Sequence, residues 1–202
     1  MNRRQFWGAY AESKKGTGLE IATEWIAASD GQGKVAVDLG CGNSDITACL
    51  LLRQWRVIAI DYAPGVVRHL TQSYQPAIDK KQLQCVQGDV ATVNLDQPVD
   101  LVIASDIFPY IDPSKFRATW EKIHRFFLKE GGILIGSLFC FGKDHRQINM
   151  LKEMGAWFLL DTSTALALAE QTGYKVLDHR IRHRGDTDPI CFQFILQKKY
   201  GL

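Results

Sequence analysis

Two glycines separated by one residue, Gly40 and Gly42, follow a short apolar segment, 35–39, and precede a segment with helical character, 44–55. Because glycine has no side chain, the backbone of such a turn can approach a ligand closely. The free N–H groups and the positive dipole end of the following helix favour an anionic group at the same place. A strand, a glycine turn and a helix in this order therefore predict a ligand-binding loop, with a plain turn as the alternative.

The spacing of this turn argues against a dinucleotide cofactor. Dinucleotide-binding turns follow the pattern G-x-G-x-x-G, and the sixth position counted from Gly40 is Asp45. A carboxylate beside a pyrophosphate would repel it. A nicotinamide-dependent dehydrogenase is therefore the least favoured enzyme class for this chain.

Two acids follow the next apolar segments along the chain. Asp61 ends the segment 57–61, and Asp89 follows the segment 83–86 after Gln87 and Gly88. An acid at the end of the second strand of such a unit can accept hydrogen bonds from both hydroxyls of a ribose. Asp89 could accept a hydrogen bond from an adenine amino group. A helix cap for Asp61 and a turn aspartate for Asp89 are the structural alternatives.

Three side chains are candidates for a general base, which a reaction needs only if its nucleophile must lose a proton. Asp106 and Tyr110 follow the apolar segment 99–104, and His145 lies in a later polar loop. Each also has a structural interpretation: a cap for Asp106, a packed ring for Tyr110 and a solvated loop residue for His145.

The order of the apolar segments predicts an α/β fold. Strand-like runs alternate with helical segments, and the chain closes with two strand-like segments, 174–184 and 190–198. Right-handed crossovers place the carboxyl ends of the first five strands on one edge, where open parallel sheets bind ligands. The residues expected there are Gly40, Asp61, Asp89, Ser105 and Phe139.

Length and composition indicate one ordinary globular domain. The 202 residues are 46% hydrophobic and 23% charged, with a net charge of +2 that favours neither nucleic acid nor a membrane surface. Five cysteines at scattered spacings suggest neither a disulfide framework nor a metal site, so a cytoplasmic location is expected. No signal peptide and no membrane span is expected. Oligomeric state cannot be read from the sequence.

The chain divides into an N-terminal helical part and a core. We expect residues 1–30 to form a helical cap or lid and residues 34–198 to form a Rossmann-like core, together making one domain over 1–202. Trp7 and Tyr10 could fold over a bound ligand, and ordinary helix packing is the alternative for both.

Several motifs, taken in order, resemble those of the class I S-adenosylmethionine-dependent methyltransferases. The run Asp38-Leu39-Gly40-Cys41-Gly42-Asn43-Ser44 resembles their motif I, commonly D/E-x-G-x-G-x-G, with Ser44 where the family often has a third glycine. The segment 128–132, L-K-E-G-G, resembles the family's L-K-P-G-G turn. The resemblance implies a doubly wound, mostly parallel seven-stranded sheet of order 3-2-1-4-5-7-6, with strand 7 antiparallel and helices on both faces.

The resemblance also implies S-adenosyl-L-methionine as the cofactor and assigns a place to each matching residue. Asp38, Gly40, Cys41 and Gly42 would surround its methionine part, Asp61 would hold the ribose, and Ser105 would contact it near the reacting centre. Tyr62 would lie against adenine, and Asp89 with its neighbour Val90 would face the adenine amino group.

These expectations favour a methyltransferase that acts on a small molecule, with no metal and no nucleic-acid partner. Such an enzyme mainly holds the acceptor and the methyl donor close and aligned. An apolar or aromatic-lined acceptor pocket is suggested by Phe108, Pro109, Tyr110, Phe139 and Phe141, although they could equally be core residues. A non-catalytic module that binds S-adenosylmethionine or a nucleotide is the alternative, because Ser44 is unusual and no base is obvious. The acceptor, and whether its N, O, S or C atom is methylated, cannot be read from the sequence.

Overall fold

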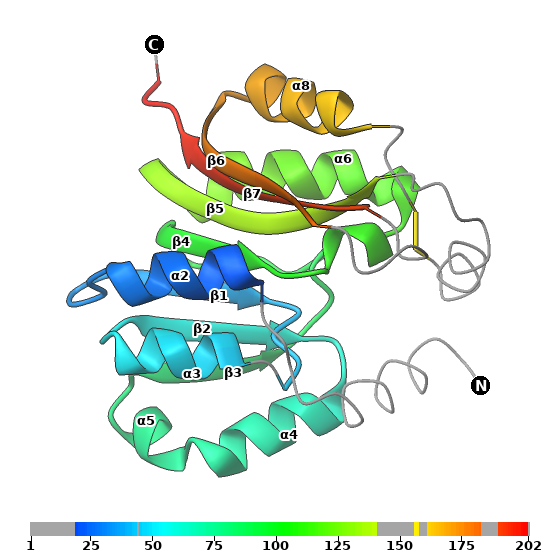
Figure 1. Cartoon of the computed structure of the whole chain (residues 1–202). Coiled ribbons are helices and arrows are strands. Elements are labelled where there is room, and N and C mark those ends of the chain that lie inside the picture. The colour runs from blue at the N-terminus through cyan, green and yellow to red at the C-terminus, as the bar shows by residue number, and fades with distance from the viewer. Residues whose placement is uncertain (1–18, 44, 141–155, 158–160, 183–189, 202) are drawn as a thin grey trace.

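A computed structural model of the chain describes residues 19–43, 45–140, 156–157, 161–182 and 190–201 (Figure 1). Five residues discussed above, Trp7, Tyr10, Ser44, Phe141 and His145, lie outside these ranges. The predicted lid over residues 1–30 can be followed only from Leu19 onward, where a helix, α2 (Glu20–Ala28), lies against the sheet.

The described strands form a seven-stranded sheet of order β3-β2-β1-β4-β5-β7-β6, which confirms the predicted fold. The pairs among β1 to β5 are parallel, whereas β7 runs antiparallel to both of its neighbours. The strand bounds are β1 Val35–Leu39, β2 Arg56–Asp61, β3 Leu83–Gln87, β4 Val99–Ala104, β5 Leu128–Cys140, β6 Tyr174–Arg182 and β7 Ile190–Lys198.

Helices cover both faces of the sheet and define two cores. The first face carries α2, α3 (Asp45–Leu52) and α4 (Pro64–Ser73), followed by the short α5 (Gln75–Asp79). The second face carries α6 (Pro113–Lys122), the π-helical turn η2 (Ile123–Phe127) and α8 (Thr162–Thr172), with the 3₁₀ turn η1 (Phe108–Tyr110) beside them. Alternation along each strand explains the division, since Ala36 belongs to the first core and Val37 to the second.

One strand begins earlier than expected. The resemblance implied a turn over 128–132 before the next strand, but β5 already begins at Leu128 and pairs there with Val99 of β4. The register shifts between Val99 and Leu101, so the glycine pair forms an irregularity inside the strand rather than a turn before it.

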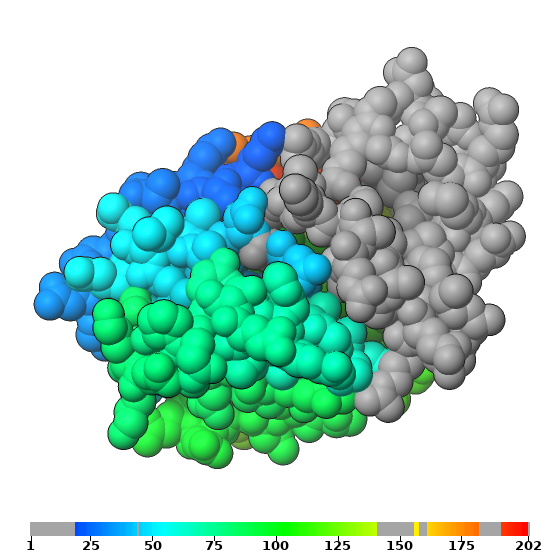
Figure 2. Space-filling model, turned by 90° about the horizontal axis from the view of Figure 1, so that it is seen from below, coloured from blue at the N-terminus to red at the C-terminus, as the bar shows by residue number. Residues whose placement is uncertain are grey.

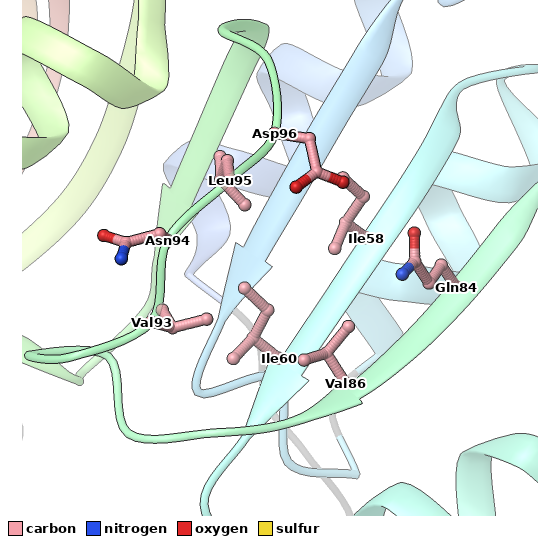
Figure 3. A pocket seen from close by; sticks show the side chains of 8 residues that line it. All are labelled: Ile58, Ile60, Gln84, Val86, Val93, Asn94, Leu95 and Asp96. Carbon is pink, nitrogen blue, oxygen red and sulfur yellow. The ribbon is translucent and has the colours of Figure 1, made fainter.

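The connection between β3 and β4, residues 88–98, contains no helix. Its segment 93–96 instead lies over the second face of β2 and β3. Figure 3 shows a shallow hollow between this segment and the strands. The residues that line it are Ile58, Ile60, Gln84, Val86, Val93, Asn94, Leu95 and Asp96. Figure 2 shows the molecule from below, where residues coloured cyan to green form a large part of the surface.

Candidate cofactor site

The glycine turn at the end of β1 has a shape that other residues would not adopt. Gly40 and Gly42 have φ angles of +65° and +50°, in the left-handed region. The N–H groups of Gly40 and Cys41 both donate to the carbonyl oxygen of Ile60, at 2.8 and 3.1 Å. A Cβ atom added at Gly40 would lie 2.7 Å from Cδ1 of Ile107. The turn is therefore held closely against β2 and the segment after β4.

Asp61, at the end of β2, is bonded directly to the glycine turn. Its Oδ2 accepts from the N–H of Gly42 at 2.9 Å, and its Oδ1 accepts from the N–H of Ala63 at 2.8 Å. Burial raises the pKa of this carboxyl group, and the hydrogen bonds from backbone N–H groups oppose that shift. Because each carboxylate oxygen has more than one lone pair, these bonds leave room for ribose hydroxyls. The next residue, Tyr62, is 46% exposed.

Asp38 lies beneath the turn. Its side chain is 1% exposed, and its Oδ2 accepts from Oγ1 of Thr47 at 2.7 Å, which ties β1 to α3. Burial raises the pKa of Asp38 to about 7, and the nearby Asp61 adds to that shift. Sequence reasoning expected this acid near the methionine part of a cofactor. The structure shows that it joins β1 to α3 just before the turn, while its place near a methionine part stays a prediction.

The loop that carries Asp89 and Val90 is held by one lysine. Asp89 is exposed and its Oδ1 accepts from the N–H of Ala91 at 2.8 Å, which is the turn role given as the alternative, while its contact with adenine stays a prediction. Val90 is buried. The Nζ of Lys122, on α6, donates to the carbonyl oxygens of Val90, Ala91 and Val93 at 3.2, 3.0 and 2.7 Å.

The segment after β4 contains a strained residue. Asp106 has a φ of +52°, a conformation that costs roughly 1–3 kcal/mol for a residue with a side chain and is often found at functional sites. Its N–H donates to Oγ of Ser137 at 3.0 Å, and that hydroxyl donates to Oδ1 of Asp106 at 2.7 Å. Ser137 is fully buried on β5. Sequence reasoning missed it, although a serine within an apolar strand is a signal.

The aromatic residues predicted for an acceptor pocket separate into two groups. Phe108 is fully buried and packs on Trp120, with ring centroids 5.3 Å apart, so it is a core residue. Tyr110 packs edge-on against Phe139 at 6.0 Å, next to Ala156 and Cys191. The second group lies at the end of β5, on the side of the sheet where the predicted site residues gather.

Strand pairing brings the predicted residues into one row. Leu39 pairs with Ile60, so Gly40 lies level with Asp61. Asp38 pairs with Ile103, so Gly40 also lies level with Ser105. The acid of the second strand, the glycine turn and the residue after β4 are therefore neighbours across three adjacent strands.

The described residues show no sign of a metal site or of a membrane span. They contain no group of three or more His, Cys, Asp or Glu residues that could hold a metal ion. No helix in the described ranges has the length and apolar character to cross a membrane. All five cysteines are free thiols.

Comparison with known proteins finds sequences of methyltransferases that are similar to this chain. Residues 36–132 match the family model described as a methyltransferase domain. Over 80 residues the chain is 30% identical to protein 235L of Invertebrate iridescent virus 6, which is named as an inferred methyltransferase. That match covers 39% of this chain and spans only 28% of the viral protein's length.

Solved structures share the fold along nearly the whole chain. The 1,6-didemethyltoxoflavin-N1-methyltransferase of Burkholderia thailandensis, solved with S-adenosylhomocysteine, has a TM-score of 0.73 and 17% identity, covering 98% of this chain and 87% of that one. An N-methyltransferase of Bradyrhizobium japonicum, also with S-adenosylhomocysteine, has a TM-score of 0.72 and 12% identity over 98% and 99%. The magnesium protoporphyrin IX methyltransferase of Synechocystis has a TM-score of 0.68 and 14% identity over 97% and 98%.

The strand order, the glycine turn and the family match point to one class of protein. Residues 36–132, just under half of the chain, match the methyltransferase-domain model, and the seven-stranded fold is that of solved S-adenosylmethionine-dependent methyltransferases.

Proposed function

We propose that the protein is an enzyme that binds S-adenosyl-L-methionine and transfers its methyl group to a small-molecule acceptor. The observation that carries the proposal is the bond between the Asp61 carboxylate and the N–H of Gly42. It places an acid suited to ribose hydroxyls beside a turn whose backbone can approach the methionine part. The bound cofactor would supply an activated methyl group on a sulfonium.

The residues of the chain would bind and orient this cofactor. In this proposal Gly40, Cys41 and Gly42 lie along the methionine part, with Asp38 supporting them from below. Asp61 accepts from the ribose hydroxyls. The residues at the adenine are Tyr62, Asp89 and Val90. Ser105, level with Gly40 in the sheet, lies near the reacting methyl group.

A proton acceptor is needed only for some acceptors, and we assign that role to Asp106. Ser137 holds one oxygen of its carboxylate at 2.7 Å, which fixes the carboxylate at the end of β4 beside the expected methyl position. Tyr110, packed against Phe139, is the second candidate from the sequence. His145 lies outside the described residues and stays a prediction.

A small-molecule acceptor is supported by the walls of the site and by the relatives. Tyr110, Phe139, Ala156 and Cys191 form a small apolar cluster at the carboxyl end of the sheet. Two of the similar structures belong to enzymes named for small aromatic or macrocyclic acceptors, 1,6-didemethyltoxoflavin and magnesium protoporphyrin IX. The net charge of +2 gives no electrostatic reason to expect nucleic acid.

Thermal melting of the purified protein tests the cofactor. S-adenosylmethionine, S-adenosylhomocysteine and NAD are added in parallel. At 100 times its dissociation constant a ligand adds about 2.7 kcal/mol of stability. For a domain of this size that raises Tm by roughly 5–10 °C. A shift with both adenosyl-sulfur ligands and none with NAD is expected. A shift with NAD alone would contradict the proposal and favour a nicotinamide-dependent dehydrogenase.

Turnover separates the enzyme from the non-catalytic alternative. The protein is incubated with S-adenosylmethionine and a pool of small metabolites, and the release of S-adenosylhomocysteine is measured. Release above that of an Asp61→Ala variant supports the enzyme. Tight binding with no release from any pool favours the binding module.

We also place the protein in a reducing compartment such as the cytoplasm. All five thiols are free, and Cys41, Cys140 and Cys191 are buried. Redox-sensitive labelling of the protein in cells tests this, and a disulfide among the five cysteines would contradict it.

A further inference from the structure

The row of site residues continues across the antiparallel half of the sheet. Ala104 pairs with Gly136, so Ser105 lies level with Ser137 of β5. Ser137 pairs in turn with Gln193 of β7. Two positions away from Ser105, Ser137 and Gln193 along their own strands lie Ile103, Ile135 and Ile195. All three belong to the core beneath α2 to α4. Ser137 and Gln193 therefore face the same side of the sheet as Asp38 and Asp61.

The residues proposed to bind the cofactor occupy one end of this row, and Ser137 and Gln193 occupy the other. Neighbouring strands lie about 4.8 Å apart, so Gln193 is about 10 Å from Ser105 and about 15 Å from Gly40. Asp61 lies beyond Gly40 on the opposite side. A cofactor held by its ribose at Asp61 and by its methionine part at Gly40 would leave the positions of Ser137 and Gln193 to the methyl acceptor.

Gln193 is buried, and its amide nitrogen has no hydrogen-bond partner among the described residues. The side chain is 1% exposed. The hydroxyl of its neighbour Ser137 is engaged by Asp106. By contrast, Nε2 of Gln197, four residues further along the same strand and on the same face, donates to the carbonyl oxygen of Gly131 at 3.2 Å. A buried donor left without a partner costs stability, and such exceptions need an explanation.

Along the strands the neighbours of Gln193 are apolar, whereas across the sheet it pairs with Arg180 of β6, whose guanidinium forms an ion pair with Glu24 of α2 at 2.7 Å. The pair Ile135–Ile195 lies towards the core, and the pair Phe139–Cys191 lies towards the carboxyl end of β5. The ring of Tyr110 packs on Phe139. A polar pair between an aliphatic row and an aromatic row suits a flat ligand with an apolar ring and one hydrogen-bonding edge.

We propose that Gln193 determines the specificity of the methyl-acceptor site by donating a hydrogen bond to a carbonyl oxygen or ring nitrogen of an aromatic acceptor. The inference rests on the proposed methyltransferase function. The ring of the acceptor lies against Phe139, and the atom to be methylated points along the row towards Ser105, within reach of the Asp106 carboxylate. Acceptors without a hydrogen-bond acceptor on this edge are rejected because they leave the buried amide unsatisfied.

A binding measurement tests the assignment directly. The protein is saturated with S-adenosylhomocysteine and titrated with 2-quinolinone, an aromatic lactam that carries the required carbonyl. We expect wild type to bind this probe, and Gln193→Met to bind it at least about tenfold more weakly. Gln197→Met, whose amide has a partner in the structure, should bind the probe as wild type does. Equal binding by wild type and Gln193→Met would overturn the proposal, as would no binding by wild type.

The stability of the same two variants gives a second readout. Removing an unsatisfied buried donor should raise Tm, so Gln193→Met should melt a few degrees above wild type. Gln197→Met should melt at or below wild type because it loses a hydrogen bond. A lower Tm for Gln193→Met would mean that its amide is paired within the fold, and the assignment would then be wrong.

The proposed function and this inference fail in different ways. If wild type does not bind S-adenosylhomocysteine, the proposed methyltransferase function is wrong, and the proposed acceptor site is then wrong as well. If S-adenosylhomocysteine binds to all three proteins with equal affinity while the probe does not distinguish Gln193→Met, only the role of Gln193 is wrong.

Discussion

At the scale of single residues, the same acid has a structural task and a proposed binding task. Asp61 accepts from two backbone N–H groups, which shape the turn, and the proposal adds ribose hydroxyls to the same oxygens. A substitution to alanine would remove both contributions at once. Replacing one oxygen while keeping the size of the side chain is the sharper test.

We expect Asp61→Asn to weaken the binding of S-adenosylhomocysteine by about 10- to 100-fold, because hydrogen bonds to a charged group contribute roughly 1.5–3 kcal/mol. The asparagine NH₂ group would also oppose one of the two backbone N–H donors. Isothermal titration calorimetry measures the effect. Asp79→Asn is the control, since Asp79 is exposed and accepts a hydrogen bond from the side chain of Gln75. Equal affinities for the two variants would remove Asp61 from the site.

Asp38 makes the stability of the protein depend on pH. Burial raises its pKa to about 7 from a value near 4 in the unfolded chain. Between these values the folded state keeps a proton that the unfolded state has lost, so the free energy of unfolding falls as pH rises from about 4 to about 7. Above pH 7 the loss is complete.

Asp38→Asn should remove this dependence. Its Tm relative to wild type should increase as pH rises from 4 to 7 and stay constant above that range. Melting curves at intervals from pH 4 to pH 8 measure it. Two Tm profiles that run parallel would show that Asp38 titrates normally.

At the scale of elements, a lysine on α6 fixes the connection between β3 and β4, which has no helix of its own. The connection 88–98 has no helix, and three of its carbonyl oxygens accept from Lys122 of α6. Burial lowers the pKa of Lys122, and the nearby Asp89 opposes that shift. This clamp fixes the loop on which Asp89 and Val90 are presented.

Lys122→Met should therefore lower Tm and weaken the binding of S-adenosylhomocysteine by about tenfold, since a charged donor to three carbonyl groups is lost. Calorimetry and thermal melting measure both effects. Lys129→Met is the matched control, because Lys129 forms an exposed ion pair with Asp100, and such pairs contribute roughly 0–1 kcal/mol. The clamp is refuted if the two variants behave alike.

At the scale of the whole molecule, one sheet joins two cores. Trp55 is buried on the first face with Leu50 and Val57, and Trp120 is buried on the second face with Phe108 and Phe194. The strands contribute alternate residues to both cores, so neither core can form without the sheet. We expect the chain to unfold as a single domain.

Urea unfolding tests this expectation. Tryptophan fluorescence, which reports on both faces, and far-UV circular dichroism, which reports on the backbone, should give the same midpoint. Single variants Trp55→Phe and Trp120→Phe should each lower that midpoint while keeping one transition. Two separated transitions would divide the chain into independent units.

Local sequence patterns predicted most of the architecture. The strands 99–104 and 190–198 have the predicted bounds, and a glycine in the left-handed conformation, Gly173, ends α8. These elements follow from apolar runs and helix-ending residues, which act over a few residues. The gathering of Gly40, Asp61 and Ser105 was also predictable, because right-handed crossovers bring the carboxyl ends of parallel strands to one edge.

Contacts between residues far apart in the chain were decided only by the tertiary structure. The Asp106–Ser137 pair spans 31 residues, and the level of Gln193 beside Ser137 depends on the register of two antiparallel strands. The raised pKa of Asp38 depends on what covers it. A shift of one residue in register would turn each of these side chains to the other face of the sheet, and that register is set by packing across strands rather than by any local pattern.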